Sequence, residues 1–266
     1  MAMMANKENI RDMIQDSLSN NEHNLEELKE DVQRKFADIV DPEIFENEVI
    51  HIIGVGATGS LIANLLCRFG FEIHVYDFDD VETKNTYNQY YRFEDVGKQK
   101  VYALASRLNQ ETGGIVRVVP HNEKVTDASN MSGIIITTVD SIDSRKAIGL
   151  SLKEFKFLLD PGIPMNVEEL IFAAGRVRLV LPNNIDEWLQ YYDDDSDEQM
   201  KARLEQSVKG CEAQQYSLLC HDVATQTAKI VVSLVYCLAT NKRLTFDKGY
   251  IVSGAMPGIV SQTVYN

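Results

Sequence analysis

The spacing of hydrophobic residues along the chain changes near residue 46. Within 1–45 the apolar side chains recur at helical intervals, which predicts two amphipathic helices. These side chains are Ile10, Met13, Ile14, Leu18, Leu25, Leu28, Val32 and Phe36. Pro42 ends the second helix, because proline disfavours a helical conformation in the residue before it. The pattern predicts a helical N-terminal extension over 1–45 and a separate domain over 46–266.

This domain opens with a continuous apolar run, 49–56, that is typical of a strand buried on both faces. Residues 71–77 read as a second strand, and 60–69 between them reads as a helix. The alternation continues with helices at 97–109 and 142–155 and strands at 114–119, 133–138 and 157–160. We therefore expect an α/β fold: a Rossmann-like, largely parallel sheet of at least four strands with flanking helices.

The last third of the chain is less regular. Residues 170–182 are apolar and rich in strand formers, and 183–222 are predicted as an irregular, acidic crossover region. The run Asp193-Asp194-Asp195 in this region is a solvated loop or, alternatively, a metal site. Residues 223–240 form a nearly all-apolar helix, which suits either a core helix or a homodimer interface.

The charge balance excludes some partners. With 26 Lys+Arg against 40 Asp+Glu, the net charge of −14 argues against a broad nucleic-acid surface. No apolar run approaches the roughly 18 residues of a membrane span, and the polar N-terminus does not resemble a signal peptide. We expect a cytoplasmic protein that binds neither nucleic acid nor membrane.

The cysteines and histidines give no clear metal site. No two of the four cysteines have Cys-x-x-Cys spacing, so no structural zinc is expected. Cys67 and Cys237 lie in apolar runs and are interpreted as buried residues, whereas Cys211 and Cys220 have more polar neighbours. The histidines in or at the ends of strands are expected to pack or cap rather than bind metal: His51, His74 and His121.

A glycine triplet marks a candidate nucleotide site. Gly54-x-Gly56-x-x-Gly59 follows a strand and opens a helix, where glycines let the backbone approach phosphates and the helix N-terminus attracts them. Asp77 ends the next strand, where a carboxylate can accept hydrogen bonds from ribose hydroxyls, or can be an ordinary strand-end residue. These residues alone allow either a dinucleotide such as NAD or ATP.

Further motifs narrow this choice. They are Asp77-Phe-Asp79-Asp80-Val81, Asn85-Thr-Tyr-Asn88-Gln89, Asp95-Val-Gly97-Lys98-Gln99-Lys100 and Thr137-Thr138-Val139-Asp140-Ser141-Ile142-Asp143-Ser144-Arg145. In this order they resemble the signature of the ThiF/MoeB/E1-like adenylyltransferases, which activate carboxylates with ATP. The resemblance covers about residues 49–145 and extends weakly to the apolar C-terminal helix.

The resemblance implies a role for each matching position. Gly54, Gly56 and Gly59 would surround the ATP phosphates, Asp77 would hold the ribose, and Asp79 matches the second acidic residue. Asn85 and Gln89 match polar residues on the phosphate side, Lys100 matches the lysine that neutralises the phosphates, and Asp140 matches the aspartate that holds Mg²⁺. Two simpler interpretations stay open: the amides of Asn85 and Gln89 could brace the loop, and Asp140 could cap the following helix.

The sequence also departs from the family pattern. Asn88 stands where the family has arginine, which removes a cationic fork from the phosphate site. Arg92 or, from the partner subunit's N-terminal segment, Arg34 could supply the charge. Some relatives form a thioester or persulfide on a downstream cysteine, so Cys211 is a possible nucleophile, although a structural role is the simpler interpretation.

The resemblance therefore predicts Mg²⁺- and ATP-dependent adenylylation of a carboxylate, in a small protein or peptide, by a homodimer. A first alternative is a ThiF-like protein that binds a nucleotide or a partner without turnover, because Asn88 replaces the arginine and the zinc-binding cysteine pairs of many relatives are absent. A second alternative is an NAD-dependent oxidoreductase.

Overall fold

A computed structural model describes residues 48–114, 117–163, 175–192 and 211–239, together with the backbone of two strands at 249–256 and 259–265. Within 211–239, side chains are described for 221–238. The predicted N-terminal helices, Arg34 and the Asp193–Asp195 run lie outside the described residues.

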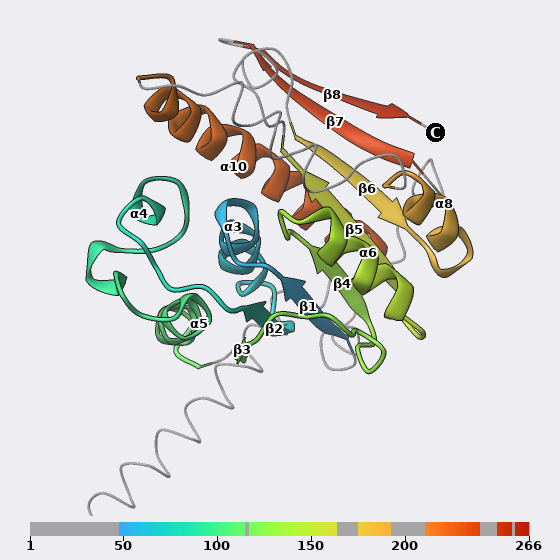
Figure 1. The fold of residues 1–266 in the computed structure, drawn as a ribbon, viewed down its shortest axis with the longest axis horizontal. Coiled ribbons are helices and arrows are strands. Elements are labelled where there is room, and N and C mark those ends of the chain that lie inside the picture. Colours follow the sequence, from blue (N-terminus) through green and yellow to red (C-terminus); the bar gives the residue numbers. More distant parts are fainter. Residues whose placement is uncertain are drawn as a thin grey trace, which may run out of the picture.

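The described strands form one sheet of eight strands, in the order β3-β2-β1-β4-β5-β6-β7-β8 (Figure 1). Their bounds are β1 Val49–Ile53, β2 Glu72–Asp77, β3 Val118–Asn122, β4 Ile134–Thr137, β5 Phe157–Gly162, β6 Arg176–Val180, β7 Gly249–Met256 and β8 Ile259–Tyr265. The strands from β3 to β5 pair in parallel, and β6, β7 and β8 pair antiparallel. The expectation of a Rossmann-like, largely parallel sheet is confirmed, and the sequence pattern missed the β7–β8 hairpin.

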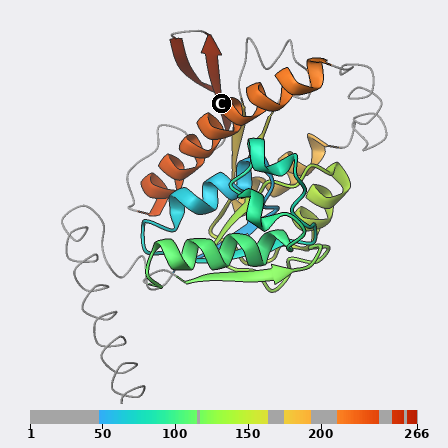
Figure 2. The same cartoon turned by 90° about the vertical axis from the view of Figure 1, so that its left-hand side faces the viewer.

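Helices cover both faces of the sheet (Figures 1 and 2). Those described are α3 Ala57–Leu66, α4 Asn85–Asn88, α5 Lys100–Glu111, α6 Ile142–Ser151, α8 Ile185–Gln190 and α10 Cys211–Ala239, with short 3-10 turns at Phe93–Asp95 and Pro182–Asn184. One core cluster joins α3, α5 and α10 to the sheet, and a second joins α6 and α8 to its other face. None of the helices in the described ranges is both long and apolar enough to cross a membrane.

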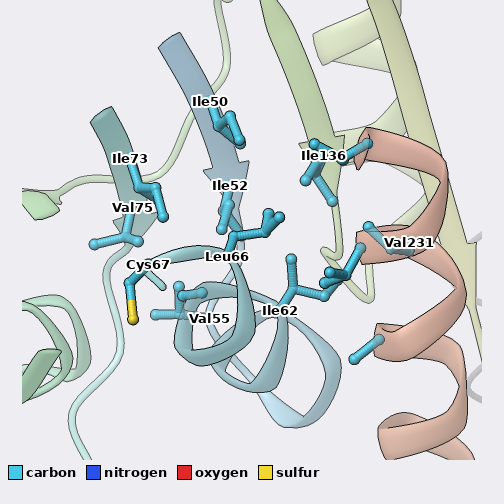
Figure 3. Packing of buried hydrophobic residues seen from close by; sticks show 14 of the residues in the cluster. Ile50, Ile52, Val55, Ile62, Leu66, Cys67, Ile73, Val75, Ile136 and Val231 are labelled. Atoms are coloured by element: carbon cyan, nitrogen blue, oxygen red, sulfur yellow. The ribbon is translucent and has the colours of Figure 1, made fainter. Parts of the chain in front are cut away.

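The two clusters follow the alternation of side chains along each strand. Ile50 and Ile52 of β1 face α3 and α10, whereas Ile53 belongs to the cluster under α6. Figure 3 shows the first cluster, to which Ile62 of α3 and Val231 of α10 both contribute. The apolar residues of α10 therefore pack within this chain, as the core-helix interpretation expected, and the homodimer stays a prediction.

The region predicted to be irregular, 183–222, is partly helical. It contains α8, whose Trp188 is buried, and the first turns of α10, which begins at Cys211. The residues at 211–220 include several polar helix formers, so they continue the helix without the apolar signal that identified 223–240. Because Gly149 has no side chain, α8 packs closely against α6: a Cβ at this position would overlap the Trp188 ring.

A cluster of histidines lies across the neighbouring strands β1, β2 and β3. His51 pairs in register with His74, and His121 with Tyr76. His74 and His121 are hydrogen-bonded through ring nitrogens 2.9 Å apart, and His51 Nδ1 lies 2.9 Å from the Tyr76 hydroxyl. Burial, together with repulsion from His74 and His121, lowers the pKa of His51 from 6.5 to about 4. These imidazoles pack against one another across strands.

Candidate nucleotide site

The candidate site lies where the strand order reverses. From β1 the chain builds β2 and β3 on one side, and β4 starts the other side of the sheet. In open parallel sheets ligands bind in the crevice at the carboxyl ends of the strands beside such a switch point. The glycine turn follows β1, Asp77 ends β2, and Thr138 follows β4, so three candidate segments converge at this edge.

Two of the three glycines are required by close contacts. Gly54 has a positive φ of 89°, and its N–H donates to Tyr76 O at 2.7 Å. A Cβ at Gly59 would overlap Gly54 O and the Thr138 hydroxyl. Together they let the turn fold tightly against the end of β4.

Gly56 has a different role. Among the described residues nothing lies within 4 Å of the position that a Cβ of Gly56 would take. Gly56 directly precedes α3, so the N–H groups of the first helical turn and the helix dipole face this open side. The turn therefore fits the phosphates of a nucleotide.

Thr138 is a site residue that sequence analysis missed. Its hydroxyl donates to Gly54 O at 2.5 Å and its N–H donates to Ile53 O at 2.8 Å, which fastens the end of β4 to the glycine turn. The residue was visible in the Thr137–Arg145 motif, but its partner lies 84 positions away in sequence.

The carboxylate of Asp77 shapes the same turn. Its Oδ2 accepts from Val55 N at 2.8 Å and its Oδ1 accepts from Asp79 N at 3.0 Å. Each carboxylate oxygen has a second lone pair, so a ribose hydroxyl can still bind there. The strand-end role and the proposed ligand role are therefore compatible.

Asp79 and Lys100 form an ion pair at the edge of the site. Lys100 Nζ lies 2.8 Å from Asp79 Oδ2, and the lysine side chain is 8 % exposed while the aspartate is 52 % exposed. Lys100 N–H also donates to Asp79 O at 2.9 Å, so backbone and side chain fix the same pair. A buried ammonium at the first residue of α5 is thus held beside the acidic end of β2.

The loop that contains α4 lies over the first turn of α3. Tyr90 N–H donates to Ser60 Oγ at 2.9 Å, and the Tyr91 hydroxyl donates to Val55 O at 2.8 Å. Burial and the nearby Asp77, Asp95 and Asp79 raise the pKa of Tyr91 well above its usual value, so this hydroxyl keeps its proton. Asn85 braces the loop, because its Oδ1 accepts from Glu82 N at 2.7 Å.

The side-chain amides of Asn88 and Gln89, in the same loop, have buried oxygen atoms without a hydrogen-bond partner in the described part of the chain. These atoms are Asn88 Oδ1 and Gln89 Oε1. Leaving a buried polar atom unpaired costs about 1–3 kcal/mol. These amides are therefore candidates for a ligand or water contact beside the glycine turn, in contrast to the bracing role of Asn85.

The structure does not bring Arg92 to the glycine turn. Its guanidinium contacts Glu94 at 3.2 Å and lies 4.0 Å from Glu111, which also pairs with Arg68 at 3.2 Å. Arg68 follows the C-terminal end of α3, and the glycine turn lies at the other end of that helix. Arg92 therefore faces away from the position where phosphates would bind.

Asp140 is exposed in the connection between β4 and α6. The cap of α6 is Ser141, whose hydroxyl accepts from Ser144 N at 3.1 Å, so Asp140 does not have the capping role that the sequence left open. Across the described ranges no group of three or more His, Cys, Asp or Glu side chains could enclose a metal. A single exposed carboxylate still suits Mg²⁺, which usually binds one or two carboxylates together with substrate phosphates and water.

A buried network of charged side chains supports the connection between β4 and α6 that contains Asp140. The sequence did not predict this network. Arg145 forms an ion pair with Asp160 and donates to Thr137 O and Pro161 O, both at 3.3 Å. Asp160 Oδ2 accepts from Trp188 Nε1 at 2.8 Å and from the Tyr192 hydroxyl at 2.5 Å. The network thus joins the carboxyl ends of β4 and β5 to α8.

The possible nucleophile Cys211 is the first residue of α10, and its side chain lies outside the described part. Cys67 is buried at the end of α3, and burial raises the pKa of its thiol to about 11. Such a thiol is protonated at neutral pH and suits the packing role that its apolar neighbours indicated.

Parts of this chain are similar in sequence to curated proteins. The NEDD8-activating enzyme E1 catalytic subunit of Arabidopsis thaliana is 36% identical over 105 residues, which are 37% of this chain and 23% of that protein. The ubiquitin-like modifier-activating enzyme 5 of Drosophila virilis is 25% identical over 165 residues, 55% of this chain and 40% of that protein. The chain thus spans less than half the length of these relatives.

Solved structures share its fold. Escherichia coli MccB with AMPCPP and MccA matches with a TM-score of 0.58 and 16% identity over 84% of this chain and 65% of that one. MccB with ATP matches with a TM-score of 0.57, 15% identity and the same coverage. Residues 42–247 match the ThiF family over most of the chain. With the glycine turn, the acidic strand end and the Asp140 connection in the order found here, the chain belongs to the ThiF family.

Proposed function

We propose that this protein uses Mg²⁺ and ATP to adenylylate a carboxylate, in the form of the C-terminus of a small protein or peptide. The observation that carries the proposal is the convergence of the open glycine turn, the Asp79–Lys100 pair and Asp140 on the carboxyl edge of the sheet. Membership of the ThiF family and the MccB structure that contains ATP support ATP over NAD.

In the proposed reaction a carboxylate oxygen attacks the α-phosphorus, the bond between the α-phosphorus and the β-bridging oxygen breaks, and pyrophosphate leaves with that electron pair. The carboxylate is ionised at pH 7, so it attacks without a general base. The N–H groups at the start of α3 and the ammonium of Lys100 would stabilise the phosphate oxygens, and Asp77 would orient the ribose.

Asp140 would hold Mg²⁺ close to the phosphates. Bound there, Mg²⁺ would neutralise phosphate charge and help to position the triphosphate. The buried Arg145–Asp160 network would keep the Asp140 connection in place, because Arg145 of α6 donates to Thr137 O at the end of β4 and so ties together the two elements that flank the connection.

ATP–pyrophosphate exchange in the presence of candidate peptides tests the proposal. Lys100→Ala and Asp140→Ala should each lower exchange at least about a hundredfold if these groups stabilise transition-state charge. Lys98→Ala is a matched control, because Lys98 pairs with Asp95 on the exposed side of the same turn. A wild-type protein that binds no ATP, or one that prefers NAD in parallel calorimetric titrations, would overturn the proposal.

A second candidate function is nucleotide binding without turnover. It is favoured by Asn88 at the family's arginine position and by the placement of Arg92 away from the turn. This alternative predicts ATP binding with no adenylate formed. A gain of exchange activity in Asn88→Arg would identify a degraded enzyme, whereas exchange by the wild type would exclude this alternative.

A further inference from the structure

His221 lies on the face of α10 that packs against α3. The residues three, seven, ten and fourteen positions after it share one face of a helix with it. They are Ala224, Ala228, Val231 and Val235, and all four are fully buried. Val231 belongs to the same core cluster as Ile62 of α3, and α10 packs against α3 (Figure 3). Because His221 continues this face by one turn, its side chain points toward the α3 side of α10.

One ring contact and the rise of an α-helix locate His221 along α10 relative to α3. The ring of Tyr236 lies 6.2 Å from the ring of Phe69, just beyond the C-terminal end of α3. Going back along α10 from Tyr236 to His221 covers about 22 Å, and going back from Phe69 to Gly56 covers about 20 Å at the rise of an α-helix. His221 therefore lies toward the end of α10 that corresponds to the N-terminal end of α3, where the glycine turn is.

The sheet gives the same position independently. A Cβ at Gly175 would collide with the Thr227 hydroxyl and would lie 3.2 Å from the carbonyl oxygen of Gly162. Gly162 is the last residue of β5, so Thr227 lies at the carboxyl edge of the sheet. His221 precedes Thr227 by six residues, or about 9 Å, and so lies beyond this edge, on the side of the sheet where the crevice is.

The ring of His221 has an unsatisfied nitrogen. Its Nδ1 is buried, and none of the described residues forms a hydrogen bond with it. Helix α10 also contacts α4, whose last residue is Asn88. Asn88 stands where the family has arginine, so the phosphates would lack one cationic donor on this side.

We propose that His221 Nδ1 donates a hydrogen bond to the phosphate oxygens of the bound nucleotide and so takes over part of the role that the family's arginine has at position 88. This inference rests on the proposed function, because it requires ATP in the crevice. It makes α10 a contributor to the site beyond the motifs of residues 49–145.

Calorimetric titrations of the full chain with ATP, AMP and adenosine test the inference. His221→Phe should weaken ATP binding about tenfold or more, as expected for loss of a hydrogen bond to a charged group, and should leave adenosine binding within about twofold. His221→Gln retains an N–H donor and should recover part of the ATP affinity. Lys229→Gln, on the exposed face of the same helix, should bind all three ligands like the wild type.

Equal affinity of His221→Phe and the wild type for ATP would overturn the inference while leaving the proposed function intact. An equal loss of ATP and adenosine affinity would also overturn it, because that result indicates altered packing rather than a phosphate contact. If His221→Phe does not fold, His221→Ala, which removes the donor without adding bulk, is titrated in its place with the same expected and contradicting outcomes. A wild-type protein that binds no ATP would refute the proposed function and this inference with it.

Discussion

The hydroxyl of Thr138 donates a 2.5 Å hydrogen bond to the carbonyl oxygen of Gly54 and so connects two loops that lie 84 positions apart. One loop is the glycine turn after β1, and the other leads from β4 to Asp140. A hydrogen bond between the two loops therefore fixes the proposed phosphate site relative to the loop that carries Asp140, the proposed Mg²⁺ ligand.

Removing this hydroxyl should loosen both loops. Thr138→Val keeps the shape of the side chain but leaves Gly54 O with one donor fewer, so unfolding should become easier by about 1–3 kcal/mol and ATP affinity should fall. Urea unfolding and calorimetry measure the two effects. Thr138→Ser, which retains the hydroxyl, should lie close to the wild type, and equal losses in both variants would exclude this hydrogen bond as the cause.

The glycines of the turn should respond differently to alanine. Gly59→Ala places a methyl group on the backbone oxygen of Gly54, so we expect a loss of at least about 2 kcal/mol of stability. Gly56→Ala points into open space and should leave the melting temperature nearly unchanged while weakening ATP binding. If both variants melted at the wild-type temperature, the close contact at Gly59 would be refuted.

The buried ion pair beneath the Asp140 connection should be sensitive to the loss of one partner. Asp160→Asn removes the charge opposite Arg145, and an uncompensated buried charge costs about 3–5 kcal/mol. Tyr192→Phe removes one hydrogen bond to the same carboxylate and should cost only about 1 kcal/mol. Denaturant unfolding measures both, and a smaller effect in Asp160→Asn than in Tyr192→Phe would contradict this account.

The histidine cluster should make stability depend on pH. Burial lowers the pKa of His51 from 6.5 to about 4, so between these values the unfolded chain binds a proton that the folded chain does not. The contribution of neutral His51 is complete above pH 6.5 and is lost as the pH falls toward 4. Burial and His74 lower the pKa of His121 as well, so its effect has the same sign.

From pH 7.5 to pH 5 the free energy of unfolding should fall by about 2 kcal/mol on account of His51. Urea titrations of the wild type and His51→Gln at both pH values isolate this contribution, because carboxyl groups titrate alike in the two proteins. The same fall in both proteins would show that His51 is not the responsible group.

Much of the fold could be predicted from short segments of the sequence. The strand at Val49–Ile53, the glycine turn and the helix after it are adjacent in sequence, so hydrophobic spacing and glycine placement determine them locally. The hairpin of β7 and β8 was missed because its apolar runs are short and are interrupted by polar residues or glycine. The early start of α10 was missed because residues 211–217 are mostly polar.

The candidate site, like the fold, could be predicted only in part from the sequence. The sequence by itself determined the residue types of Gly54–Gly59, Asp77, Lys100 and Asp140, because each lies within a local motif. Only the tertiary structure decided which side chains meet: it turned Arg92 toward Glu111, buried Arg145 against Asp160, and brought Thr138 to the glycine turn. The reason is physical, since backbone conformation depends on neighbouring residues whereas contacts between distant segments depend on how the sheet and helices pack in three dimensions.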